Sequence, residues 1–203
     1  VENNYLIELD VHLTKDGKVV VVHDDNLKRL TGNDVNVIDL NLDEIRKMKL
    51  LGTEEKIPTL QEVLEVVNGK VPIIIELKYD RKAGELEPVL AEILDKYNGK
   101  FAVKSFNPFI VRWFKKNRPE YIRGLLIGYK YKKIKDQIFS RNLFFMISKP
   151  DFISCEYKLF DNKKICKYKK KCLSLAWTIK NKECFDSMKE KFDNLICENI
   201  EEM

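Results

Sequence analysis

The run Val71-Pro-Ile-Ile-Ile-Glu76-Leu-Lys78 constrains the fold of this chain more than any other segment. Its three consecutive isoleucines do not alternate with polar residues, so they predict a strand that is buried on both faces. Strands of this kind occur in parallel sheets whose faces are covered by helices. Ile74, Glu76 and Lys78 share one face of the strand. A carboxylate at that place is costly unless it meets a cation.

The rest of the chain alternates segments of strand length and helix length, which is typical of an α/β fold. The capping box Thr59-Leu-Gln-Glu62 predicts a helix through Val67, and Pro108 opens another helix. Further helices are expected at 42–50, 85–97 and 182–192. Seven strands are expected, beginning at Leu6, Val71, Phe101, Ile122, Phe152, Leu173 and Asn194.

A (β/α)8 barrel of the TIM type needs eight strands, so seven indicate either an open sheet or a barrel with one element outside the sequence. We favour the barrel, with its first strand and helix preceding Val1, because residues 1–5 resemble the tail of a helix that leads into a strand. No linker or change of composition divides the chain. We therefore expect one barrel domain over residues 1–203.

Two more acids lie on the first strand. Alternation places Glu8 and Asp10 on the same face. Asp16-Gly17 suits a two-residue hairpin turn, and a register centred on it pairs Asp10 with His23. Residues directly opposite each other in such a pair lie roughly 5 Å apart at Cβ. The hairpin therefore either gathers carboxylates and an imidazole into one site or is a surface hairpin with solvated charges.

Three acids on two strands match the needs of a hard divalent cation. Glu8, Asp10 and Glu76 would supply oxygen ligands for Ca²⁺ or Mg²⁺. Lys78 would then face the anion that the cation holds.

Composition excludes several classes of protein. The chain of 203 residues is 44% hydrophobic and 34% charged, and no apolar run is long enough to cross a membrane, so a globular protein without stable membrane insertion is expected.

The net charge of +5 gathers at 129–135 and 163–171. We interpret these lysines as solvated helix faces and expect no nucleic-acid binding. Five cysteines without Cys-x-x-Cys spacing favour buried, reduced thiols and a cytoplasmic location. No pattern indicates an oligomer interface, and oligomeric state stays open.

Several motifs, in order along the chain, resemble the glycerophosphodiester phosphodiesterase family. They are Glu8-Leu-Asp10-Val-His-Leu-Thr-Lys-Asp-Gly17, Val22-His23-Asp24, Leu27-Lys-Arg29-Leu-Thr31-Gly32, Ile57-Pro-Thr59-Leu-Gln-Glu62-Val-Leu, Ile75-Glu76-Leu-Lys78, Ser105-Phe106-Asn107-Pro108 and Ala176-Trp177-Thr178. The resemblance implies a (β/α)8 barrel that holds Ca²⁺ or Mg²⁺. It also implies hydrolysis of small-molecule glycerophosphodiesters to glycerol 3-phosphate and an alcohol.

The resemblance assigns roles to individual residues. The family's metal-ligand positions fall on Glu8, Asp10 and Glu76. One member of its catalytic histidine pair falls on His23, and a phosphate-facing position falls on Lys78. An aromatic residue that packs on substrate at the mouth of the barrel falls on Trp177.

The sequence departs from the family in two places. The family begins with a His-Arg-Gly strand end and a Pro-Glu-Asn-Thr segment, which we expect to precede Val1. Of the two histidines present, His12 either replaces the family's other histidine or is a solvated or supporting imidazole. At the last strand, Ile196-Cys197-Glu198 stands where the family has Ile-Thr-Asp, with Glu198 as a substitute carboxylate.

The sequence thus predicts metal-dependent phosphodiester hydrolysis by acid–base catalysis. Two alternatives remain open: a barrel that binds phosphodiesters without turnover, and a phospholipase D-like enzyme acting on lysolipid or sphingolipid head groups. Arg29 and Thr31 are expected to fix the loop after His23, and Ser105 with Asn107 to cap the following helix.

Overall fold

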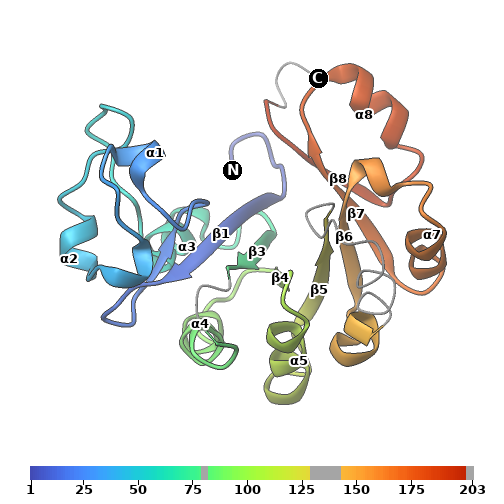
Figure 1. Ribbon diagram of the computed structural model, residues 1–203, viewed down its shortest axis with the longest axis horizontal. Coiled ribbons are helices and arrows are strands. Elements are labelled where there is room, and N and C mark those ends of the chain that lie inside the picture. Colours follow the sequence, from blue (N-terminus) through green and yellow to red (C-terminus); the bar gives the residue numbers. More distant parts are fainter. Residues whose placement is uncertain (79–81, 129–142, 200–203) are drawn as a thin grey trace. The chain divides into compact units, whose positions relative to one another are not determined.

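The computed structural model describes residues 1–78, 82–128 and 143–199 (Figure 1). The chain divides into two compact units, Val1–Val103 and Lys104–Met203. The elements of the first unit are β1 Ile7–Leu13, β2 Val19–Val21, α1 Lys28–Thr31, the 3-10 turn η1 Val37–Asp39, α2 Leu42–Ile45, α3 Leu60–Val67, β3 Ile73–Leu77 and α4 Leu86–Leu94. β4, Phe101–Ser105, runs across the boundary between the units.

The elements of the second unit are α5 Pro108–Asn117, β5 Ile122–Ile127, a helical segment at 143–148, β6 Phe152–Glu156, the 3-10 turn η2 Tyr157–Leu159, α7 Lys163–Lys169, β7 Leu173–Ile179, α8 Lys182–Met188 and β8 Asn194–Cys197. Strands β5, β6, β7 and β8 are neighbours in that order, and all three pairs are parallel. Figure 1 shows them side by side, with α7 next to β6 and β7.

In the first unit, β1 is the central strand. It pairs with β2 in antiparallel fashion and with β3 in parallel fashion. All five residues of β3 are buried, as the isoleucine run predicts. β1 and β3 therefore lie in register with their carboxyl ends at the same edge, which is where parallel strands place functional side chains.

The local signals for α3 and α5 are confirmed. Thr59 Oγ1 accepts a hydrogen bond from Glu62 N, and the Glu62 carboxylate accepts one from Thr59 N, so the predicted capping box is complete. Pro108 is the first residue of α5, and Asn107 Oδ1 accepts a hydrogen bond from Phe109 N across 2.9 Å. Side-chain caps of this kind satisfy backbone donors that have no partner within the helix.

The predicted hairpin register is wrong by one residue. Val11 pairs with Val21 rather than with Val22, and His12 pairs with Val20. The turn holds three residues, 15–17, because Gly17 adopts a φ of 74° and Thr14 N donates a hydrogen bond to Lys18 O. A three-residue loop that ends in a left-handed residue shifts the register of the strand that follows it. His23 therefore does not lie opposite Asp10.

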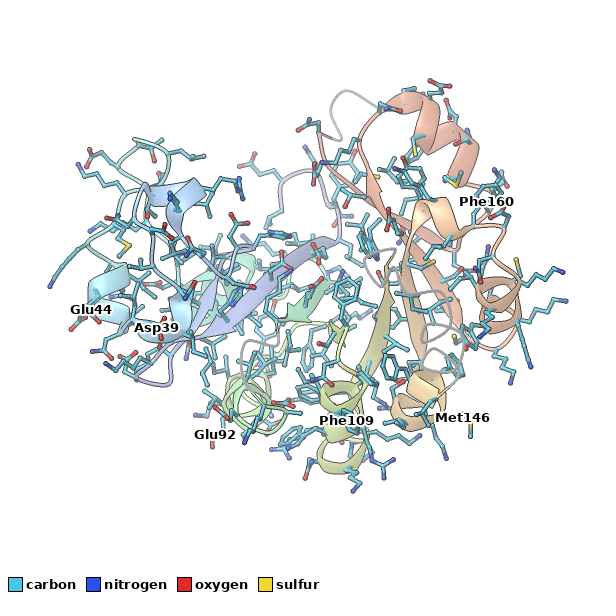
Figure 2. All side chains as sticks on the ribbon, in the orientation of Figure 1. Asp39, Glu44, Glu92, Phe109, Met146 and Phe160 are labelled. Atoms are coloured by element: carbon cyan, nitrogen blue, oxygen red, sulfur yellow. The ribbon has the colours of Figure 1, made fainter. Side chains whose placement is uncertain are left out.

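Three predicted helices are shorter than expected. α4 covers Leu86–Leu94 instead of 85–97. α2 ends at Ile45 instead of residue 50, because the chain turns there through i→i+3 hydrogen bonds such as Met48 N to Ile45 O. α8 ends at Met188 instead of residue 192. The exposed Glu44, labelled in Figure 2, completes a capping box at α2, since its carboxylate accepts a hydrogen bond from Asn41 N.

Each unit has its own apolar core. In the first unit, one cluster packs Val20 and Val22 against residues that follow the hairpin, Leu27, Val37, Ile45 and Ile57. In the second unit, Ile165 and Tyr168 of α7 pack with Ile153 and Cys155 of β6 and with Ala176 of β7. These cores hold the hairpin against the loop after it and hold α7 against its strands.

Two expectations from composition meet the structure only in part. The lysine-rich stretch 163–171 includes α7, as expected, whereas 129–135 lies outside the described residues. All five cysteines are free thiols, but only Cys155 is fully buried. No helix among the described residues has the length and hydropathy needed to span a membrane.

Candidate metal and acid–base site

Three carboxylates meet where β1 and β3 pair, and one of them, Glu76, is the last residue but one of β3. The parallel register places Asp10 beside Glu76 and Glu8 beside Ile74. One carboxylate oxygen from each of Glu8, Asp10 and Glu76 lies within 4.8 Å of the other two. The structure thus brings together the three acids that the sequence predicts as ligands.

Lys78 follows β3 and reaches into this group of acids. Its ammonium donates to Asp10 Oδ1 and to Glu76 Oε1, each across 2.8 Å. Burial disfavours the charged form of Lys78, but the negative charges of Glu76 and Asp10 outweigh burial and raise the pKa of the ammonium above its usual value. The costly carboxylate on β3 therefore does meet a cation, and in this structure that cation is Lys78.

The donor set fits a hard divalent cation. Carboxylate oxygens are preferred ligands of Ca²⁺ and Mg²⁺, and three of them lie close enough to share one ion. Glu76 is only 6% exposed, and Glu8 and Asp10 are partly buried, so all three carboxylates are at least partly shielded from solvent.

His23 lies in the loop after β2, in the same unit. Val22 N donates a hydrogen bond to Asp10 O, which ties the start of this loop to β1. The imidazole is 69% exposed, and its Nδ1 lies 2.8 Å from Asp24 Oδ1. Arg29 of α1 donates to both oxygens of Asp24, with Nε 2.7 Å from Oδ2 and Nη2 3.0 Å from Oδ1.

The charge of Asp24 is fixed by these contacts. The hydrogen bond from Arg29, helped by the one from His23, lowers the pKa of Asp24 to about 2 despite partial burial. Asp24 is therefore an ionised acceptor for the imidazole. The sequence motif contains Asp24, but we assigned it no role, although an acid next to a candidate catalytic histidine was the available signal.

Of the two ordinary roles expected for His12, solvated or supporting, the solvated one is wrong, because its side chain is fully buried. Its Nε2 lies 3.4 Å from His23 O and 3.7 Å from Asp25 Oδ1. Both contacts come from the loop after β2, which the sequence of β1 alone does not show. His12 therefore supports the backbone of the loop that carries His23.

Trp177 lies on β7 in the second unit, half-buried, and packs edge to face against Phe106 with ring centroids 5.8 Å apart. Gly128 lies beside this pair, and a Cβ added there would come within 3.2 Å of the Trp177 ring. The predicted contact of Trp177 with substrate stays a prediction.

The remaining candidates have structural roles in the residues described. Glu198 forms a 2.9 Å ion pair with Lys180 and is 55% exposed. Thr31 Oγ1 donates to Leu27 O within the loop that Arg29 also holds, as expected. Ser105 Oγ accepts from Asn107 N, next to the cap of α5.

Comparison with known proteins identifies the relatives of this chain. A family model described as "Glycerophosphoryl diester phosphodiesterase family" matches residues 4–193. A curated glycerophosphodiester phosphodiesterase from Caldanaerobacter subterraneus is 38% identical over 59% of this chain and 54% of its own length. Human lysophospholipase D GDPD1 is 37% identical over 46% of this chain and 32% of its own length. The chain thus matches about half of the first relative and a third of the second.

Solved structures show the same fold. A phosphodiesterase from Oleispira antarctica, in complex with the product sn-glycerol-3-phosphate, matches with a TM-score of 0.80 and 23% identity over 95% of this chain and 80% of its own. A glycerophosphodiester phosphodiesterase from Thermotoga maritima matches with a TM-score of 0.71 and 29% identity. The match covers 94% of this chain and 80% of that chain. These matches confirm the predicted α/β fold of the TIM-barrel class.

Proposed function

The chain belongs to the glycerophosphoryl diester phosphodiesterase family, and from this premise we propose that it hydrolyses glycerophosphodiesters to glycerol 3-phosphate and an alcohol. The observation that carries the proposal is the cluster of Glu8, Asp10 and Glu76, two of which, Asp10 and Glu76, contact the Lys78 ammonium. Three carboxylates on paired parallel strands, with a lysine next to two of them, suit a cation and the phosphate that it binds.

Each group has a role in the proposed reaction. Glu8, Asp10 and Glu76 would hold Ca²⁺ or Mg²⁺, which when bound supplies Lewis-acid polarisation of the phosphoryl oxygens. Lys78 would donate hydrogen bonds to a phosphoryl oxygen where negative charge develops. His23 would exchange a proton through Nε2, because its Nδ1 already bonds to Asp24.

In the balanced reaction, water adds to phosphorus and the bond from phosphorus to the alcohol oxygen breaks. The alcohol leaves with one proton, and glycerol 3-phosphate keeps the phosphoryl group. Trp177 would pack on substrate. The proposal includes one barrel domain over residues 1–203, supported by structural likeness over 95% of the chain, and a cytoplasmic location, supported by the five free thiols.

The test uses protein produced from its complete gene. Release of glycerol 3-phosphate from glycerophosphocholine should require Ca²⁺ or Mg²⁺, stop in excess chelator and return when the metal is restored. Full turnover in chelator would contradict the metal role. Binding of glycerophosphocholine without turnover would instead support a non-catalytic barrel.

A second substrate distinguishes glycerophosphodiester hydrolysis from hydrolysis of a lysolipid. The human relative named lysophospholipase D motivates it, since it shares 37% identity over 46% of this chain. Lysophosphatidylcholine should be hydrolysed more slowly than glycerophosphocholine at equal concentration. A higher kcat/KM for the lysolipid would assign the chain to the alternative substrate class.

A further inference from the structure

Asp24 joins His23 to Arg29 through three short hydrogen bonds. Asp24 Oδ1 lies 2.8 Å from His23 Nδ1. Arg29 donates to both oxygens of the Asp24 carboxylate, from Nη2 to Oδ1 across 3.0 Å and from Nε to Oδ2 across 2.7 Å. Asp24 is 19% exposed, whereas the two side chains that it joins are 69% and 65% exposed. The carboxylate thus lies at the protected centre of a group that is otherwise open to solvent.

We propose that Asp24 and Arg29 are positioning residues that hold His23 in the tautomer with hydrogen on Nδ1, so that Nε2 faces the reaction. The inference rests on the proposed function, in which His23 moves the proton. Neither positioning residue needs to touch substrate. Arg29 acts only through Asp24, and Asp24 acts only through the imidazole.

The tautomer follows from the chemistry of the partner. An ionised carboxylate only accepts hydrogen bonds, so the ring atom that faces it must carry the hydrogen. A neutral imidazole with hydrogen on Nδ1 leaves Nε2 as an acceptor, ready to take a proton and later to return it. If Asp24 were free to rotate away, the ring would also sample the opposite tautomer and other orientations.

The backbone around His23 is held independently of this group. Val22 N bonds to Asp10 O before the histidine, and Val37 N bonds to Asp25 O after it. His12 Nε2 also lies 3.4 Å from His23 O. With the main chain tied on both sides, orientation of the ring is the freedom that Asp24 and Arg29 restrict.

Arg29 differs from an ordinary surface charge. Its neighbour on α1, Lys28, makes a single 2.8 Å contact with Asp34, and both partners of that pair are more than 60% exposed. Exposed single-contact pairs contribute little to fixed geometry. The two parallel contacts from Arg29 instead fix the plane of the Asp24 carboxylate, and a lysine cannot reproduce them.

The experiment measures tautomer and turnover separately. The tautomer of His23 is read from the ¹⁵N shifts and two-bond couplings of the ring, at a pH where the imidazole is neutral, with signals assigned by their loss in His23→Ala. The variants are Asp24→Asn, Arg29→Gln and Arg29→Lys. Lys28→Gln is the matched control, because it removes an ion pair from the same helix without touching this group.

In the natural protein, the ring should carry hydrogen on Nδ1. In Asp24→Asn the amide oxygen should turn to Arg29, so its NH₂ faces the imidazole and the opposite tautomer should dominate. We expect kcat to fall by about 100-fold or more, in line with loss of a group that orients a catalytic histidine, while KM changes little. Arg29→Gln should mix the tautomers and lower kcat by about 10-fold, with partial rescue in Arg29→Lys. Lys28→Gln should match the natural protein.

Either of two results would overturn the inference: an unchanged tautomer in both Asp24→Asn and Arg29→Gln, or a loss of kcat in Arg29→Gln no larger than in Lys28→Gln. Circular dichroism of each variant identifies misfolding, and the isosteric Asp24→Asn keeps the test valid if Arg29→Gln unfolds. The NMR result needs no turnover. If the natural protein hydrolyses no phosphodiester, the proposed function fails, and the tautomer measurement still decides whether Asp24 and Arg29 orient the ring.

Discussion

Lys78 Nζ lies 2.8 Å from Asp10 Oδ1, and both side chains are only 14% exposed. The same ammonium contacts Glu76, so Lys78 neutralises two of the three carboxylates that would bind a metal. A divalent cation that binds these acids must compete with an ammonium that is already present. Lys78 therefore links metal binding to phosphate binding.

Replacing Lys78 with Met should separate these two effects. We expect divalent-metal affinity to rise by a few-fold, because the competing charge is gone, and kcat to fall by at least about 10-fold, because a donor to the phosphoryl group is lost. Isothermal titration calorimetry with Mg²⁺ or Ca²⁺ measures the metal affinity, and steady-state kinetics measure kcat. Lys70→Met, at an exposed lysine, is the control. Weaker metal binding in Lys78→Met would contradict the idea that the Lys78 ammonium competes with the metal for these carboxylates.

The isosteric change Glu76→Gln should weaken the metal site. Glu76 is 6% exposed and supplies one of three clustered carboxylates, so the variant loses a charged ligand. The metal dissociation constant should rise by more than about 10-fold, and activity at low metal should fall in parallel. Glu65→Gln, on the exposed face of α3, should change neither. Unaltered metal affinity in Glu76→Gln would argue against this ligand set.

Asp24 should make stability depend on acid pH. Its pKa is lowered to about 2 in the folded protein by the hydrogen bond from Arg29, so the ionised form is favoured by folding. The stabilisation is present above the ordinary carboxyl range, near pH 4, and disappears as pH falls through about 2. Since His23 and Arg29 are exposed, the gain should be at most about 1 kcal/mol.

Urea unfolding of the natural protein and of Asp24→Asn, at several pH values, measures this dependence. The difference in unfolding free energy should be constant above the carboxyl range and should shrink toward zero in acid. A difference that stays the same down to pH 2 would show that the charge of Asp24 is not its source.

Gly128→Ala should disturb the aromatic pair of the second unit. An added Cβ would lie 3.2 Å from the Trp177 ring and 3.3 Å from Phe106, closer than ordinary contact, so one ring must shift. Trp177 fluorescence should change, and KM for glycerophosphocholine should rise if this ring packs on substrate. A Trp113→Phe background isolates the Trp177 signal, and metal affinity should stay unchanged. An altered ring with an unaltered KM would remove Trp177 from the substrate site.

Local patterns predicted much of the fold. The first residues of β5 and β8 were predicted correctly, the capping box of α3 is complete, and β3 is buried along its whole length. Each of these features depends on residues within a few positions of one another. Hydrophobic runs and capping side chains act over that range, so their outcome can be derived without knowing the rest of the chain.

The errors arose where the outcome depends on geometry beyond the local pattern. Asp16-Gly17 fits a two-residue turn, but Gly17 in the left-handed region closes a three-residue loop, and that single extra residue moves His23 away from Asp10. His12 is buried and contacts His23 O and Asp25 of the loop after β2, which no spacing on β1 reveals.

The sequence by itself determined which residue types could form the site: two acids on one strand face, a third acid on a doubly buried strand, and a histidine after the hairpin. Only the tertiary structure decided their partners. Parallel pairing of β1 with β3 places Asp10 beside Glu76 with Lys78 between their charges, and α1 brings Arg29 onto Asp24. Ion pairs and hydrogen bonds depend on distances of about 3 Å, and strand register and loop packing set those distances after the chain has folded.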